Sequence, residues 1–130
     1  EQLNTNYRVG GWTVRQVVNH IADSHMNSYM RFKLALTEDT PEIRPYAEDK
    51  WAELEDGKNC DINISLALIE ALHFRWVMLL KSMSKEDFEK KFYHPEQKKE
   101  FTLGVTAAMY SWHGRHHLKH ISDLKDRNNW

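Results

Sequence analysis

Residues 13–36 read TVRQVVNHIADSHMNSYMRFKLAL, and this stretch gives the clearest indication of the fold. Thr13 followed three residues later by Gln16 matches a capping box, in which two side chains bond backbone N–H groups at the start of a helix. Apolar side chains then recur at the helical period of 3.6 residues. They are Val14, Val17, Val18, Ile21, Ala22, Tyr29, Phe32 and Leu36. The stretch predicts one long amphipathic helix that ends between residues 36 and 38.

Two further stretches predict long helices. Residues 64–83 carry an apolar stripe, and residues 103–127 follow Thr102, a residue type that favours the N-cap position. The remaining sequence predicts a short helix at 47–55, a turn at 56–59, one helical turn after Ser84, and a small hairpin around 95–99. Three long amphipathic helices joined by loops predict an all-α antiparallel bundle.

Composition and charge narrow the class of protein. The 130 residues suit a single domain spanning 1–130, and 41% apolar with 28% charged residues is typical of globular chains. A formal net charge of −1 favours neither a nucleic acid nor an anionic membrane as partner, and we expect no apolar run of the ~20 residues that span a membrane. Cys60 is the only cysteine, so no internal disulfide can form. A reducing cytoplasm is the expected location.

Half of the eight histidines lie in one short run, WHGRHHLKHI at residues 112–121. His113 and His117 are four residues apart, and so are His116 and His120, so each pair shares one face of a helix. On a helical wheel all four fall within the apolar arc, and we expect them to face the core. They could be core histidines bonded to neighbours, but two such pairs on one inward face favour a shared metal ion.

Two histidines leave a metal site incomplete, because a catalytic metal usually has three protein ligands and an open position. The third ligand must come from another helix. His20 borders the apolar stripe of residues 13–36 and is the first candidate, and His73 on the middle long helix is the second. Asp23, one turn from His20, is the nearest acid, and we expect it to face solvent or orient a histidine.

Residues 11–29, GWTVRQVVNHIADSHMNSY, resemble the start of the second helix in DinB/YfiT-like proteins. The similarity extends over essentially the whole chain, and the run at 112–121 resembles the last metal-binding helix of that family. The resemblance implies an up-down-up-down four-helix bundle whose first helix would precede Glu1 and is therefore expected to be missing here. It also implies that the metal ligands are His20, His113 and His117, with His116 and His120 as supporting pocket residues.

The resemblance also bears on the chemistry, because the family has been described as metal-dependent hydrolases and includes bacillithiol S-transferases. Three imidazoles suit Zn²⁺ or Ni²⁺. Such an ion can lower the pKa of bound water to about 7 or hold a thiol as its thiolate. The zinc-peptidase pattern H-E-x-x-H is absent, since Gly114 follows His113, and no carboxylate occurs between residues 105 and 122. This argues against peptidase-like hydrolysis and favours an activated thiol.

These observations predict a metal-dependent S-transferase that joins a bacillithiol-type thiol to an electrophile. Arg31 is expected to meet a carboxylate of the thiol, and His116 to act in the pocket. A hydrolase of a small ester or amide is the alternative enzyme. A non-enzymatic stress module with a structural metal is the third reading, and a fourth protein ligand such as His116 or His73 would favour it. We further expect a homodimer that binds neither nucleic acid nor a membrane.

Overall fold

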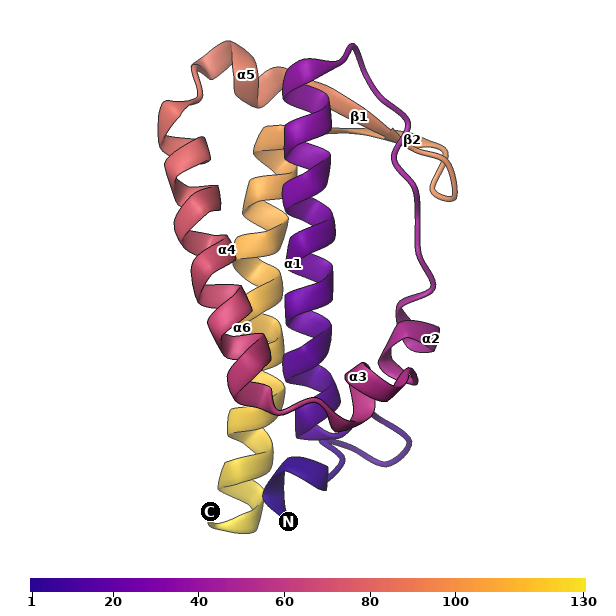
Figure 1. Cartoon of the computed structure of the whole chain (residues 1–130), viewed down its shortest axis with the longest axis vertical. Helices are drawn as coiled ribbons and strands as arrows, with labels where there is room; N and C mark the ends of the chain where they lie inside the picture. The colour runs from indigo at the N-terminus through magenta and orange to yellow at the C-terminus, as the bar shows by residue number, and fades with distance from the viewer.

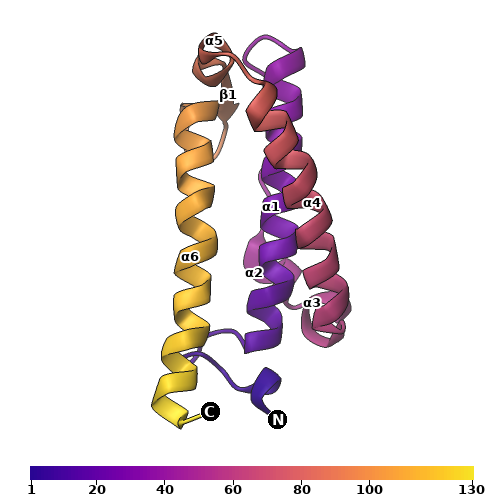
Figure 2. The same cartoon turned by 90° about the vertical axis from the view of Figure 1, so that its left-hand side faces the viewer.

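The computed structural model describes residues 1–130 and is built on three long helices that lie side by side (Figures 1 and 2). These are α1 (Val14–Thr37), α4 (Ile62–Ser82) and α6 (Leu103–Asn128). Shorter elements connect them: η1 (Gln2–Asn4), α2 (Glu48–Ala52), α3 (Glu55–Asn59), α5 (Lys85–Glu89) and a hairpin of β1 (Lys91–His94) and β2 (Lys99–Thr102). The all-α bundle and the small hairpin are confirmed. The turn predicted at 56–59 is instead part of α3.

The helix directions differ from the predicted alternation. The Ser65 hydroxyl near the start of α4 donates to the Asn19 side chain near the start of α1, over 2.7 Å. Further along both helices, Phe32 packs edge-on against Trp76. Helices α1 and α4 are therefore parallel, and α6 runs antiparallel to both (Figure 1). The cause is the connection at residues 38–61, which returns along the bundle before α4 begins, so the up-down alternation does not apply to α1 and α4.

The predicted capping box is present at the start of α1. The Gln16 backbone N–H donates to the Thr13 hydroxyl over 3.2 Å, and the Thr13 backbone N–H donates to the Gln16 side-chain oxygen over 3.0 Å. The Thr102 hydroxyl caps α6 in the same way by accepting from the Val105 N–H. These caps fix the first turns of the two helices that carry the candidate metal ligands.

The main hydrophobic cluster lies at the end of the bundle next to the hairpin. It joins α1, the loop after it, α4, β1 and α6 through Phe32, Ala35, Ile43, Trp76, Phe92 and Leu103. Phe32 and Leu103 are fully buried. This cluster holds α1, α4 and α6 together at the end of the bundle away from His20 and His117.

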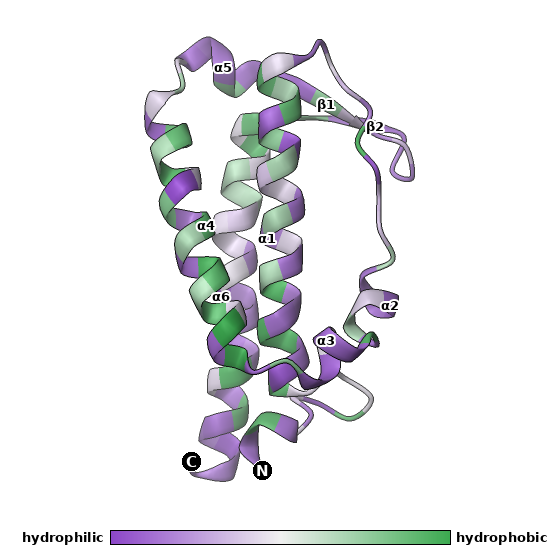
Figure 3. Ribbon diagram, in the orientation of Figure 1, coloured by the Kyte–Doolittle hydropathy of each residue, from purple (hydrophilic) through white to green (hydrophobic).

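Helix α4 is the most apolar of the long helices (Figure 3). By length and composition alone it could cross a membrane, contrary to the expectation that no stretch would reach that length. The helix carries Glu70 and Arg75 near its middle and packs on α1 along one side. Its other side exposes Ile64, Leu66, Leu68, Phe74, Val77 and Met78.

Helix α3 is docked so closely on the elements beside it that Gly57 cannot carry a side chain. An alanine Cβ there would lie 2.7 Å from the Trp51 carbonyl oxygen and 2.9 Å from that of Ala52. Backbone oxygens cannot turn aside, so Gly57→Ala is expected to lower the free energy of unfolding by about 1–3 kcal/mol in chemical denaturation. In Gly114→Ala, the matched control, the new Cβ meets nothing closer than 3.8 Å. Equal stability of the two variants would contradict this expectation.

Candidate metal centre

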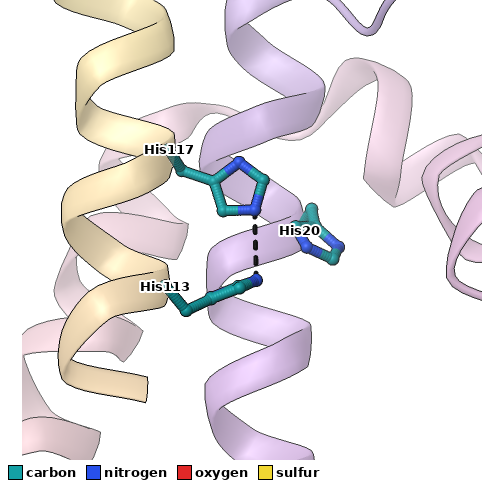
Figure 4. A group of neighbouring side chains, drawn as sticks. All are labelled: His20, His113 and His117. Atoms are coloured by element: carbon teal, nitrogen blue, oxygen red, sulfur yellow. Dashed lines mark hydrogen bonds between the residues drawn. The ribbon is translucent and has the colours of Figure 1, made fainter. Parts of the chain in front are cut away.

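Three of the predicted residues converge between α1 and α6: His20, His113 and His117 (Figure 4). Each offers one ring nitrogen, and these nitrogens all lie within 4.8 Å of one another. The Nε2 atoms of His113 and His117 are 3.1 Å apart. The His20 ring centroid lies 5.5 Å from that of His113 and 5.0 Å from that of His117. The structure thus brings together the trio implied by the resemblance, and His73 is not part of it.

Helix geometry and packing position these rings. His113 and His117 are one turn apart on α6, so their rings project from the same face. His20 faces them from α1, where it is only 4% exposed and lies under the Trp12 ring at a centroid distance of 4.6 Å. Ligands from two capped and packed helices are held more rigidly than ligands from loops.

Burial keeps the three imidazoles neutral. It lowers the pKa of His20 to about 4, with a further contribution from His113, and that of His117 to about 3, with further contributions from the other histidines. Burial, with the nearby His116, also lowers the pKa of His113. Neutral imidazole has a free lone pair and is the form that binds metal ions.

The arrangement of donors fits a divalent cation. Two lone pairs 3.1 Å apart repel unless a proton or a cation lies between them. Zn–N bonds of about 2.0–2.1 Å put two ligands of a tetrahedral ion about 3.3 Å apart, close to the His113–His117 separation. The Nδ1 atom of His117 is buried without a hydrogen-bond partner, so no second bond within the chain fixes this ring. The three residues could hold one Zn²⁺ or Ni²⁺ ion.

The prediction that all four clustered histidines face the core is wrong for His116. This residue is exposed and stacks on Trp112 at a centroid distance of 4.5 Å. Val105 and Met109 on the same flank of α6 are also exposed, so the apolar arc of the wheel is wider than the face that packs on α1. His120 is half-buried and stacks on the Tyr7 ring.

A cleft of about 560 Å³ connects the centre to the second predicted functional residue, Arg31. His113 and Tyr110 of α6 line it together with Arg31 of α1 and Tyr46 of the long connection, while His116 does not line it. Arg31 and a candidate metal ligand therefore face one cavity. Asp23 is half-buried, and burial, together with the Asp56 carboxylate of α3, raises its pKa.

Sequence reasoning missed two features of this region. Glu48 of α2 lines the same cleft, and desolvation and the neighbouring Asp49 raise its pKa. No local pattern marks Glu48, because only the path of the long connection brings it there. The second feature is His25, which is 3% exposed and contacts both His73 and His113. Its position follows from the crossing of three helices, which helical periodicity does not describe.

A family model of the DinB superfamily matches residues 1–121. The chain belongs to the DinB superfamily. A superfamily relative from Bacillus cereus (strain ATCC 10987 / NRS 248), named "Putative metal-dependent hydrolase", is 60% identical over 130 residues, which cover all of this chain and 74% of the relative. A protein of the same description from Bacillus thuringiensis subsp. konkukian (strain 97-27) is 59% identical with the same coverage.

A solved structure supports the same assignment. It is described as "YfiT from Bacillus subtilis is a probable metal-dependent hydrolase with an unusual four-helix bundle topology". It matches with a TM-score of 0.98 and 55% identity, covering 99% of this chain and 74% of that chain. The predicted family and the four-helix-bundle fold class of this DinB-superfamily protein are confirmed.

The buried histidines predict a loss of stability in acid for the metal-free protein. The ordinary pKa of 6.5 applies in the unfolded chain, whereas burial lowers the folded value to about 4 for His20 and about 3 for His25 and His117. Below pH 6.5 the unfolded state therefore binds more protons, and the free energy of unfolding falls as pH decreases towards 3. A pKa difference of one between the states is worth about 1.4 kcal/mol per group.

Urea denaturation of the chelator-treated protein, followed by circular dichroism between pH 8 and pH 4, measures this effect. We expect a nearly constant unfolding free energy above pH 7 and a steady fall below pH 6.5. A flat profile down to pH 4 would show that these rings do not remain neutral in the folded state.

Proposed function

We propose that this DinB-superfamily protein is a metal-dependent enzyme that transfers a low-molecular-weight thiol, of the bacillithiol type, to an electrophile. His20, His113 and His117 would hold one Zn²⁺ or Ni²⁺ ion. The observation that carries the proposal is the convergence of three neutral imidazoles, one of which, His113, also lines the cleft that contains Arg31. The description of its relatives as metal-dependent supports the metal part of this proposal.

A divalent ion with three imidazole ligands keeps its full charge and an open position, and so supplies a lowered pKa to a bound thiol or water. The chain contributes the binding site around that position. The last long helix offers no carboxylate between residues 105 and 122 to act as a base beside His113 and His117. Thiol activation needs no such base, which favours thiol transfer over peptidase-like hydrolysis.

Arg31 is suited to bind the far end of the thiol. It lies eleven residues after His20, about 16 Å further along α1 at 1.5 Å per residue, and its long side chain shortens this span. A guanidinium forms paired, charge-assisted hydrogen bonds with a carboxylate. A thiol that carries a carboxylate several bonds from its sulfur would therefore bridge the metal centre and Arg31.

Hydrolysis of a small ester or amide is the second candidate, and Glu48 favours it. This carboxylate lines the cleft together with His113, and its raised pKa brings it closer to the range in which a general base operates. A water molecule placed in the cleft could give its proton to Glu48. The names of the relatives agree with this alternative.

An assay with bacillithiol and monochlorobimane tests the proposal directly. The zinc- or nickel-loaded chain should form the fluorescent conjugate, and the chelated chain should not. Arg31→Ala is expected to raise the KM for the thiol about 10- to 100-fold, because a hydrogen bond to a charged group is worth about 1.5–3 kcal/mol. Arg75→Ala is the matched control, since Arg75 approaches the Tyr29 ring from α4 and does not line the cleft.

The alternatives give different results in the same preparation. Metal-dependent ester or amide cleavage that is lost in Glu48→Gln, without conjugation of any small thiol, would identify a hydrolase. An absence of turnover combined with four protein ligands on the metal would identify a structural site.

A further inference from the structure

A row of histidines continues from the candidate metal centre through the bundle to α4. Nδ1 of His113 lies 3.3 Å from Nε2 of His25 on α1. Nδ1 of His25 lies 2.7 Å from Nε2 of His73 on α4. Three rings from three helices are thus joined nitrogen to nitrogen. His73 ends the row at a small surface cavity that it lines with Val77 and Ser111.

His25 is firmly held in the middle of this row. It is 3% exposed, and the rings of Trp76 and Tyr110 meet it edge-on at 6.1 Å and 5.2 Å. Gly114 of α6 faces it without a side chain, and a Cβ there would contact the Cε1 atom of His25 at 3.8 Å. The ring therefore has little freedom to turn away from His73 and His113.

The row has a single proton arrangement when His113 binds a metal through Nε2. A neutral imidazole carries one N–H and one lone pair, so His113 must then keep its proton on Nδ1 and donate it to Nε2 of His25. His25 must in turn carry its proton on Nδ1 and donate it to Nε2 of His73. His73 is left with its proton on Nδ1, at the surface end of the row.

We propose that His25 and His73 are positioning residues that fix the tautomer and ring orientation of His113, so that its Nε2 atom faces the metal. This inference rests on the proposed metal site. Ligating histidines generally donate their other N–H to an acceptor that orients them, most often a carboxylate, a carbonyl or a water. No carboxylate contacts His113 here, and the lone pair of His25 takes that place, with His73 holding His25 in the accepting form.

Metal affinity measured by competition with a chelating dye tests the role of His73, which is the safer residue to change because it is only partly buried. His73→Phe removes the acceptor for His25, and we expect metal binding to weaken about 10- to 100-fold, as is typical for a lost outer partner of a ligand. His73→Gln restores an acceptor oxygen and should recover most of the affinity. Phe74→Leu, next to His73 on exposed surface, is the matched control and should bind like the unchanged chain.

A double variant tests whether the three rings act in series. His25→Ala should weaken metal binding at least as much as His73→Phe does. Adding His73→Phe to His25→Ala should cause no further loss, because His73 reaches His113 only through His25. Losses that multiply in the double variant would overturn the serial arrangement, and so would unchanged affinity in folded His73→Phe.

Nitrogen NMR of histidine-labelled protein separates this inference from the proposed function. We expect ¹⁵N–¹⁵N couplings across the His25–His73 hydrogen bond already in the metal-free chain, so this result does not depend on metal binding. In the zinc-bound chain, His25 and His73 should both be protonated on Nδ1. A proton on Nε2 of His25 in the zinc-bound protein would overturn the inference, whereas an unchanged chain that binds no metal would overturn the proposed function and leave the couplings in place.

Discussion

His113→Ala is expected to abolish tight metal binding. His113 lies one turn from His117 on α6, with the two Nε2 atoms 3.1 Å apart, and its ring centroid lies 5.5 Å from that of His20 on α1. Removing it leaves two imidazoles, fewer than the three protein ligands usual for a catalytic metal. The loss should therefore exceed the roughly 10- to 100-fold weakening that follows removal of an outer partner of a ligand.

Metal content after gel filtration, together with dye competition, measures this loss, and circular dichroism verifies that the variant is folded. His116→Ala is the matched control, because it removes a histidine from the same helix that is exposed and stacked on Trp112. The control should keep its metal. Full occupancy in His113→Ala, or loss of metal only in His116→Ala, would contradict the assignment and favour the His116–His120 pair.

The fold could be predicted where local patterns determine it. The capping box at Thr13 and the apolar period after it located α1 to within a residue or two of its bounds. The direction of α4 could not be obtained in this way, because it depends on the path of residues 38–61 rather than on any pattern within α4. Neither periodicity nor composition shows that this connection crosses the whole length of the bundle.

In the candidate site, too, local sequence patterns predicted some features and the packing of the helices determined the others. The pairing of His113 with His117 follows from their spacing on one helix, while His20 was favoured over His73 mainly by the family resemblance. The row through His25 depends on how α1, α4 and α6 are rotated against one another. Glu48 of α2 lines the cleft because of the path that residues 38–61 take. Contacts between helices that are distant in sequence could thus not be predicted from this single sequence.

Phe32→Ala is expected to lower the free energy of unfolding by about 3–5 kcal/mol, the usual cost of emptying a buried aromatic site. Phe32 is fully buried, and its ring meets Trp76 edge-on at 5.2 Å within the cluster that also holds Ile43 and Leu103. Chemical denaturation of the metal-free chain gives the value. Met30→Ala changes a residue of the same helix that is 54% exposed, and it should shift stability by no more than about 0.5 kcal/mol.

The Phe32 variant also shows whether the core and the histidine site are energetically separate. A ligand that binds only the folded state adds stability that depends on its affinity and concentration, about 2.7 kcal/mol at a hundred times Kd. If the cluster around Phe32 only holds the helices together, Zn²⁺ should stabilise Phe32→Ala and the unchanged chain by the same amount. A smaller increment in Phe32→Ala would mean that the cluster also sets the distance between α1 and α6 at His20, and that metal affinity depends on packing at the opposite end of the bundle.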